Sequence, residues 1–586
     1  MTFRRLSSLL LAALMLGICA QSASAQKYPK LAPYEEIRWN PEVQIDGTWY
    51  ILRSIDELPV VEMVAFAKRQ YGPRWEKRIS EDLVQVLTEM GRAPGETVRL
   101  VVYDWGTGQE ETFDDVALTA KNRRSILDSR RTEESKPAAI STAQPQDLRR
   151  ALDDFRAALD GRWSYRHANR ADFVTAFSDL HQKVDSGISI NEFGIELQKI
   201  VSLGIDGHAG VSGIDLPSEG YLPFLVEPVG DRFVAFKPDR SGFLVDGFPY
   251  LTKIDGKEVS DWCEVASSLE PKGSPQFVRR HCLRNLRALD FVRGLMSLPT
   301  EDVVEVELAA EEHANRKTLM LPVAKRSPTY GKWPRGDSRH LDGKIGYLRL
   351  SAMDENAVEE IREWMPKFRD TVGLVVDVRD NGGGSREALR WLYSYLASPD
   401  DPPRAFTAAA YRLHEEHQDD HLAQRFMYSV DSKEWTESER RAVARFARTF
   451  RPEWDLPEDQ FSDWHYMVLS RLADPRIYHY PRPVVVLMNA KCFSATDIFL
   501  AGLKGMENVT LLGTSSGGGS ALSQRVGLGA TPFRLRIGSM ASFQSNGKLF
   551  DGNGVPPDVE VEPVPIYYIG GEDNALEEAV ERLHGR

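Results

Sequence analysis

The sequence predicts an α/β protein of several domains, and three observations carry this prediction. The chain has 586 residues, which is too long for one hydrophobic core and suggests roughly three to four domains. From residue 343 onward, apolar strand-like runs alternate with amphipathic helical segments, a pattern typical of helices packed on a sheet. Before that region, residues 148–204 have helical periodicity throughout, and residues 215–325 change to short strand-like runs separated by turns.

Residues 1–25 predict a cleaved secretory signal. Arg4 and Arg5 precede the apolar run LSSLLLAALMLGIC, and QSASA then offers an Ala-x-Ala cleavage site. No later segment approaches the length of about 18 apolar residues that a membrane span needs. Lipidation at Cys19 is disfavoured, because Ile18 stands where a small residue is required. We therefore expect an exported chain, periplasmic or extracellular, with no membrane span.

Composition and charge exclude several classes of partner. The chain is 42% hydrophobic and 27% charged, as ordinary globular proteins are. Its formal charge of −13 becomes −15 when the two arginines of the signal are removed. An acidic chain without a long Lys/Arg run argues against binding to nucleic acid or to anionic lipid. Export permits a disulfide between Cys263 and Cys282, and the odd number of cysteines left after the signal, which includes Cys492, leaves at least one thiol free.

The first half of the chain divides into four segments. Residues 26–127 predict an N-terminal α/β domain, with TWYILRSI and VRLVVYD as strands. Residues 128–147 are small and polar and predict a linker. Residues 148–214 predict a bundle of about three helices that ends in a glycine-rich loop, and residues 215–325 predict short strands with one helical stretch between them.

The second half carries the alternating pattern. Within residues 340–565, GKIGYLRL, GLVVDV, RPVVVLMN and NVTLLG are predicted strands, and ENAVEEIREWMPKFRD and ATDIFLAGLKG are predicted helices. The pattern is interrupted at about 400–480 by a charged segment that we interpret as a helical insertion, either a lid or a subdomain. Residues 566–586 predict an amphipathic closing helix.

Ser494 lies in NAKCFSATDIF, between a predicted strand and a predicted helix. SATD fits a capping box, in which the serine oxygen accepts a helix amide and Asp497 reaches back to the cap. A serine at such a junction also lies among free backbone N–H groups, where a hydrolase stabilises an oxyanion. The local pattern permits both interpretations. Ser515 in GTSSG formally matches a nucleophile elbow, but GGGSALSQ follows it, and glycine triplets do not open helices.

Two further loops carry candidate residues. VDVRDNGGG ends a predicted strand in glycines, which either turn the chain or let backbone amides approach a ligand. Asp377 and Arg379 in this segment predict a structural ion pair or a brace for the loop. GIDGHAG places His208 in a glycine-flanked loop, where it is either incidental or a base with a pKa near neutrality. HEEHQDDH at 414–421 is not H-E-x-x-H, and a solvated charged face is favoured over a metal site.

In this order, GIDGHAG, LVVDVRDNGGG, PVVVLMNAKCFSATDIFLAGLKG, VTLLGTSSGGG and GKLFDGNGVPPDVEVEP resemble the S41 serine peptidases, the superfamily of C-terminal processing proteases and tricorn protease. The resemblance covers roughly residues 148–586. It implies a ClpP/crotonase-like α/β core, with residues 148–204 as an N-terminal cap. It also implies that residues 215–325 form a PDZ-like domain, and such domains capture extended peptides by strand addition.

The resemblance also implies roles for individual residues. Ser494 falls on the nucleophile, and the amides of Ala495 and of Gly382 or Gly383 would form the oxyanion hole. His208 fits the base of the tricorn-like branch, which uses a histidine from the cap side.

One departure from the family pattern decides the predicted mechanism. The lysine of the Ser-Lys processing proteases falls on Gly519, so no Ser-Lys dyad is predicted. The acid that orients the histidine falls on Asp551 in DGNGVPPD, with Asp206 as the alternative.

The sequence therefore predicts a secreted serine endopeptidase that acts on proteins or peptides. No metal or organic cofactor is implied, and a homo-oligomer is compatible with the sequence. The alternative is a non-catalytic protein on the same fold that binds peptides or lipophilic ligands. A His208 side chain that points away from Ser494 would favour that alternative.

Overall fold

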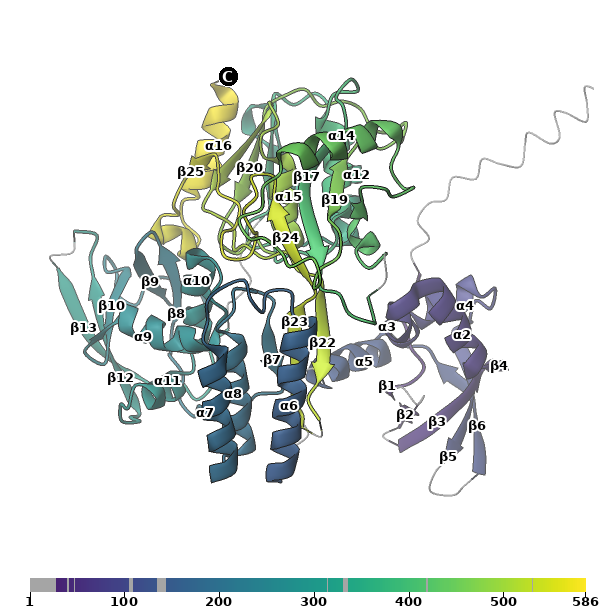
Figure 1. Cartoon of the computed structure of the whole chain (residues 1–586), viewed down its shortest axis with the longest axis horizontal. Coiled ribbons are helices and arrows are strands. Elements are labelled where there is room, and N and C mark those ends of the chain that lie inside the picture. Colours follow the sequence, from purple (N-terminus) through teal and green to yellow (C-terminus); the bar gives the residue numbers. More distant parts are fainter. Residues whose placement is uncertain are drawn as a thin grey trace, which may run out of the picture. The chain divides into compact units, whose positions relative to one another are not determined.

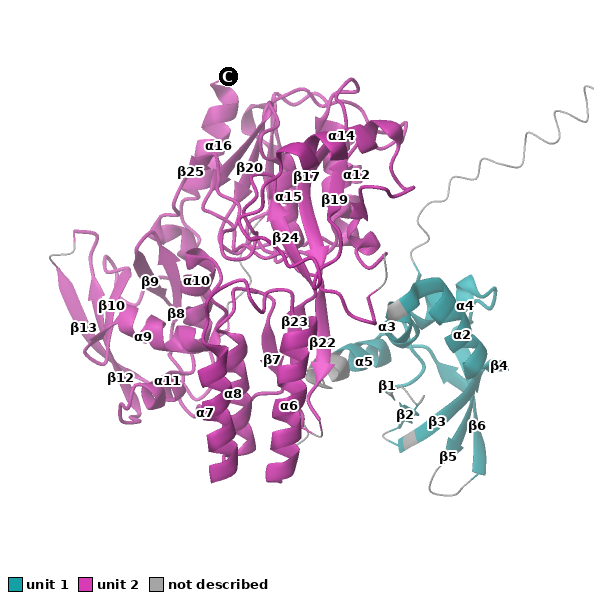
Figure 2. Cartoon of the chain, viewed as in Figure 1, with its two compact units in different colours: residues 1–136 teal, residues 137–586 magenta. Residues whose placement is uncertain are grey.

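The computed structural model describes residues 28–38, 42–46, 48–104, 109–133, 144–312, 315–329, 336–417, 420–529 and 531–585. The predicted signal at residues 1–25 lies outside this part of the chain. The chain divides into two compact units, residues 1–136 and residues 137–586 (Figure 2). Within the described part, no helix combines the length and the apolar character that a membrane-spanning helix needs.

The first unit contains an antiparallel sheet with the strand order β1-β2-β3-β5-β6, in which β4 pairs with β3. Its strands are β1 Glu36–Arg38, β2 Glu42–Ile45, β3 Thr48–Ile55, β4 Leu58–Pro59, β5 Thr97–Asp104 and β6 Gln109–Ala117. Its helices are α2 Val60–Tyr71, α3 Trp75–Glu81, α4 Leu83–Glu89 and α5 Ala120–Glu133. Both predicted strands are present. The predicted linker at 128–147 is partly wrong, because α5 continues to Glu133 and the next helix begins at Pro145; residues 134–143 lie outside the described part.

The second unit begins with the three predicted helices, which stand side by side (Figure 1). They are α6 Pro145–Arg162, α7 Phe173–Ser186 and α8 Ile190–Val201. Their apolar faces share one buried core, and a capping box of Ser189 and Glu192 fixes the start of α8. After α8 the chain enters the short strand β7 Gly210–Ser212, which joins a sheet with the order β22-β23-β7.

The region predicted as PDZ-like forms an antiparallel sheet with the order β13-β12-β10-β9-β8, in which β11 pairs with β10. Its strands are β8 Leu225–Val229, β9 Arg232–Phe236, β10 Tyr250–Ile254, β11 Lys257–Glu258, β12 Val303–Ala309 and β13 Arg316–Pro322. The single predicted helical stretch is three helices, α9 Val259–Ala266, α10 Pro275–Leu286 and α11 Leu289–Leu295. Cys263 on α9 and Cys282 on α10 are both buried, free thiols.

The alternating pattern forms a sheet with the order β14-β15-β16-β20-β21-β25, parallel from β15 to β25. Its strands are β14 Arg339–Leu341, β15 Ile345–Arg349, β16 Gly373–Asp377, β20 Val484–Met488, β21 Val509–Gly513 and β25 Val559–Glu560. The helices are α12 Glu355–Lys367, α13 Glu387–Leu396, α15 Ala495–Leu503 and the closing helix α16 Asn574–His584.

Helices cover both faces of this sheet. Alternate residues of β16 and β20 pack in a core with α12, α13 and α15 on one face and in a core with α16 on the other. Both strands are completely buried, which explains their continuous apolar sequences.

The prediction of a helical insertion at 400–480 is wrong. The segment contributes β17 Arg404–Tyr411, β18 Tyr428–Ser429 and β19 His465–Leu469 to a sheet with the order β18-β19-β17-β24, and its one α-helix within the described part is α14 Glu437–Thr449. The alanine-rich run in β17 favours a helix intrinsically, but it is buried and pairs with strands on both sides, and this tertiary context overrides the preference. The remaining strands are β22 Ser523–Gly527, β23 Arg534–Gly538 and β24 Met540–Gln544.

Candidate active site

Ser494 lies at the sharp turn where strand β20 leads into helix α15. Its backbone has φ 60° and ψ −119°, a conformation that costs a residue with a side chain about 1–3 kcal/mol. The Ser494 hydroxyl caps no helix amide, and Asp497 bonds elsewhere, so the predicted capping box is wrong. Instead, Ser494 Oγ lies 3.1 Å from Nε2 of His208.

Asn381, a residue that the sequence analysis missed, ties the glycine loop after β16 to this turn. It is fully buried, and its backbone carbonyl accepts a hydrogen bond from the Phe493 amide (3.1 Å). Its side-chain Oδ1 accepts from the Thr496 hydroxyl (2.8 Å) and from the Gly383 amide (2.9 Å). The available signal was its place directly before three glycines at the end of a buried strand.

Gly383 approaches the Ser494 turn so closely that a side chain does not fit. With φ at 101°, a Cβ there would lie 2.7 Å from Ser494 Cβ and 2.8 Å from the Ala495 nitrogen. The neighbouring Gly382 is exposed, and a Cβ there would meet nothing within 4 Å. No described residue accepts a hydrogen bond from the Gly382 or Ala495 amide. The Ala495 amide directly follows Ser494, and the loop that carries the Gly382 amide reaches the same turn through Gly383, as an oxyanion site requires.

Asp497 holds a second glycine loop against the start of α15. Its fully buried carboxylate accepts hydrogen bonds from the Ser516 hydroxyl and from the amides of Gly518 (3.2 Å) and Gly519 (3.1 Å). Burial raises the pKa of Asp497 to about 8. The side chain thus positions a loop, and this role could not be read from a pattern that resembles a helix cap.

Gly519 stands at the position where the family resemblance places the lysine of Ser-Lys enzymes. A Cβ at Gly519 would lie 2.3 Å from Cζ of Phe493 and 3.3 Å from Cε1 of His208. The aromatic ring and the imidazole therefore fill the space that a longer side chain would need.

His208 reaches Ser494 because two elements fix its loop. Helix α8 precedes the loop, and β7, which follows it directly, pairs with β23 near the C-terminal end of the chain. The ring of Phe493 lies against the imidazole, with 4.6 Å between the ring centroids. The pairing of β7 with β23 thus holds the loop in which His208 meets Ser494, although the two residues are 286 positions apart in the sequence.

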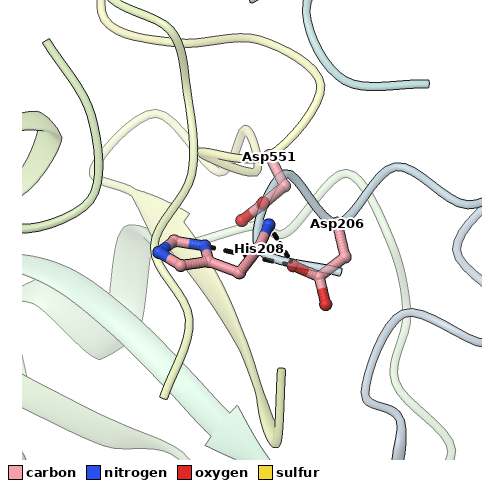
Figure 3. Close-up of side chains that lie close together, drawn as sticks. All are labelled: Asp206, His208 and Asp551. Carbon is pink, nitrogen blue, oxygen red and sulfur yellow. Dashed lines mark hydrogen bonds and ion pairs between the residues drawn. The ribbon is translucent and has the colours of Figure 1, made fainter. Parts of the chain in front are cut away.

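Two buried carboxylates face Nδ1, the other imidazole nitrogen (Figure 3). Asp206 Oδ1 lies 4.0 Å from Nδ1 and also accepts the backbone N–H of His208 at 2.9 Å. One ligand atom from each of Asp206, His208 and Asp551 lies within 4.8 Å of the other two. Nδ1 is buried and has no hydrogen-bond partner among the described residues. The predicted base and both predicted acids therefore gather at Ser494, but neither acid is within hydrogen-bond distance of Nδ1.

Aromatic residues after α6 hold the two acids, and no local sequence pattern marks either aromatic residue. Trp163 Nε1 donates to Asp206 Oδ2 at 2.9 Å, and the Tyr165 hydroxyl donates to Asp551 Oδ2 at 2.8 Å. Backbone amides complete the carboxylate contacts: Gly538 donates to Asp206 Oδ2, while Gly207 and Ser520 donate to Asp551. Both carboxylates are thereby fixed in orientation.

Burial sets the protonation states of the cluster. Burial, together with the positive charges of Arg536 and Arg425, lowers the pKa of His208 to about 3. Burial raises the pKa of Asp551 to about 7, with the negative charge of Asp206 adding to the effect, and burial also raises the pKa of Asp206. At neutral pH the imidazole is therefore uncharged, which is the form that accepts a proton, and burial favours the protonated form of both neighbouring carboxyls.

Two other predicted features have the local structure that the sequence analysis expects. Ser515 follows β21 in a loop that no helix continues, as predicted. The predicted ion pair is confirmed, because Arg379 Nη2 lies 2.6 Å from Asp377 Oδ2; Arg379 also bonds to Asp573.

Where the structure describes the histidine-rich segment, the chain forms turns and not a helix. The rings of His417 and His421 stack with 4.0 Å between their centroids, and His421 Nε2 lies 2.9 Å from the Ser539 hydroxyl. The described histidines and acids of this segment do not bring three ligand atoms together as a metal site would.

Comparison with known proteins identifies a family. The model of peptidase family S41 matches residues 344–561. A carboxy-terminal-processing protease of Bartonella bacilliformis is 32% identical over 385 residues, which is 64% of this chain and 67% of that protein.

Two solved structures, mature CPAF and mature CPAF complexed with lactacystin, are similar to this chain at 17% identity. Each match has a TM-score of 0.51 and covers 75% of this chain and 98% of CPAF. At this identity the likeness shows a shared fold. Taken with the match to the family model and the identity to the Bartonella protein, it shows that the chain belongs to peptidase family S41 and is a serine-type peptidase.

Proposed function

We propose that the chain is a secreted serine endopeptidase in which Ser494 is the nucleophile and His208 the general base. The observation that carries this proposal is the 3.1 Å between Ser494 Oγ and His208 Nε2. This distance lies within the range over which a base takes the proton of a nucleophile. Export rests on the signal pattern at residues 1–25.

In the first step, Ser494 Oγ attacks the carbonyl carbon of the scissile peptide bond, and Nε2 of neutral His208 accepts the Oγ proton. The imidazolium that forms lies beside Asp206 and Asp551, whose negative charge stabilises it. The oxyanion of the tetrahedral intermediate accepts hydrogen bonds from the Ala495 and Gly382 amides.

In the second step, the imidazolium returns its proton from Nε2 to the departing amine, and an acyl-enzyme remains on Ser494. Water then attacks the acyl carbon while His208 again accepts a proton. Collapse of the second intermediate releases the new carboxylate and restores the serine hydroxyl.

We assign Asp551 and Asp206 jointly to orienting His208. Asp206 lies nearer to Nδ1 and also holds the backbone of the histidine. Asp551 lies in the same group and is held by Tyr165. Neither acid transfers a proton to the substrate in this scheme.

Replacing Gly383 with alanine is expected to lower kcat/KM by about 10²–10³-fold, because the new methyl group displaces the Ser494 turn and the oxyanion amides. Gly161→Ala is the matched control, since Gly161 is exposed in α6 and its methyl group would also meet open space. The check is kcat/KM on fluorescently labelled casein, together with the melting temperature of each variant. Equal melting temperatures and equal activities for the two variants would contradict the close approach of Gly383.

The alternative function, a non-catalytic binding protein on the same fold, has less support, because His208 points toward Ser494 rather than away from it. Purified protein without residues 1–25 is expected to cleave labelled casein, and mass spectrometry of the products is expected to show new termini inside the casein chain. Saturable casein binding without any new termini would favour the binding protein.

A further inference from the structure

His208 Nδ1 faces an arrangement that a serine-peptidase mechanism does not require. In a Ser-His-Asp triad, one carboxylate accepts a hydrogen bond directly from Nδ1. Here Nδ1 faces two carboxylates, the nearer one at 4.0 Å, and no described residue accepts its hydrogen bond. A nitrogen and two oxygens, all buried and all within 4.8 Å of one another, therefore surround one point (Figure 3).

We propose that Asp206, His208 Nδ1 and Asp551 form an inhibitory Zn²⁺ site. One imidazole nitrogen and two carboxylate oxygens are a donor set that Zn²⁺ accepts. With bonds of 2.0–2.2 Å, a tetrahedral Zn²⁺ holds its ligands roughly 3.4 Å apart. The distances between the three atoms therefore need to shorten by about 0.6 Å for the Nδ1–Asp206 pair and by at most about 1.4 Å for the others.

The surroundings already orient the donors for such an ion. Trp163 and the Gly538 amide hold Asp206, while Tyr165 and the Ser520 amide hold Asp551. Contacts of this kind around metal ligands strengthen binding. A divalent cation would also neutralise two buried carboxyls whose hydrogen-bond donors among the described residues are aromatic side chains and backbone amides, not cations.

Zinc at this point stops the proposed reaction without touching Ser494. Coordination uses the lone pair of Nδ1, so the single proton of the neutral imidazole moves to Nε2. Nε2 then donates to Ser494 Oγ and no longer accepts its proton. The inhibition rests on the proposed mechanism, whereas the binding does not.

The ligands and the burial of the site predict which ions bind to it and how fast inhibition develops. Ca²⁺ and Mg²⁺ prefer six or more oxygen ligands, which these three buried side chains do not supply. Because Asp206 and Asp551 are completely buried, the ion enters only when the structure opens locally. We expect inhibition by Zn²⁺ to develop slowly, to be reversed by EDTA, and not to occur with Ca²⁺ or Mg²⁺.

The decisive experiment measures zinc binding on Ser494→Ala protein, which lacks the nucleophile but keeps all three ligands. Equilibrium dialysis with Zn²⁺ alone is expected to show a site whose affinity falls by about 100-fold or more when His208→Ala is added. The matched control adds His417→Asn and His421→Asn, which remove the histidine-rich segment as a zinc ligand and should leave this site unchanged. Loss of the site in the control, or its persistence without His208, would overturn the proposal.

X-ray absorption at the zinc edge of the Ser494→Ala protein tests the same site if the His208 variant does not fold. We expect nitrogen and oxygen neighbours and no sulfur. A sulfur shell would assign the zinc to Cys263 and Cys282 and contradict the proposal. Zinc binding by a chain that cleaves no casein would leave the site standing and refute the proposed function instead.

Discussion

Ser494→Ala and His208→Ala are each expected to lower kcat for casein hydrolysis by about 10⁴-fold or more, while the melting temperature changes little. Each variant removes one half of the pair that lies 3.1 Å apart. Because nucleophile and base act as a unit, the double variant should lose no more activity than either single variant. The measurement is kcat on labelled casein with purified protein.

Ser515→Ala is the matched control for this experiment. It removes the rival serine of GTSSG, which no helix follows, and should retain full activity. Full casein cleavage by Ser494→Ala protein would contradict the assignment of Ser494 as the nucleophile. If the two single losses of activity multiplied in the double variant, Ser494 and His208 would act independently, and the proposed pair would be contradicted.

Asp206→Asn is expected to lower kcat by about 10³–10⁴-fold, and Asp551→Asn by about 10–100-fold. Asp206 is the nearer acid to Nδ1 and also accepts the backbone amide of His208, so its loss removes both charge and position. Asp551 lies in the same group but is held by Tyr165 and two backbone amides.

Separate values of kcat and KM distinguish orientation of the base from a general loss of structure. Loss of orientation lowers kcat and leaves KM and the melting temperature nearly unchanged. A larger loss of kcat from Asp551→Asn than from Asp206→Asn would identify Asp551 as the main orienting acid, as the family motif implies.

The parts of the candidate site that could be predicted from the sequence are those that lie in short segments with a recognisable pattern. The turn around Ser494, the glycines before it and the loop of His208 each have a local pattern, and their order along the chain was informative. The parallel sheet was also predictable, because β16 and β20 are continuous apolar runs that burial on both faces requires.

The residues that the sequence could not reveal act across long separations. Asn381 joins the glycine loop after β16 to the turn at Ser494, and Asp497 holds the loop at Gly519. Tyr165 bonds to Asp551, which is 386 residues away in the sequence. Polar residues of these types are common in turns and caps, so no local pattern marks them. The strand β17 was mistaken for part of a helical insertion, because its alanines favour helices and only its neighbours β19 and β24 make it a strand.

The most direct test of the central claim is the rate at which a fluorophosphonate labels the protein, with the labelled residue mapped by mass spectrometry. A base within hydrogen-bond distance activates a serine toward such a reagent. We predict that the label maps to Ser494 and that His208→Ala slows labelling by about 10³-fold or more. Labelling that His208→Ala leaves unchanged, or that maps to another serine, would contradict the account.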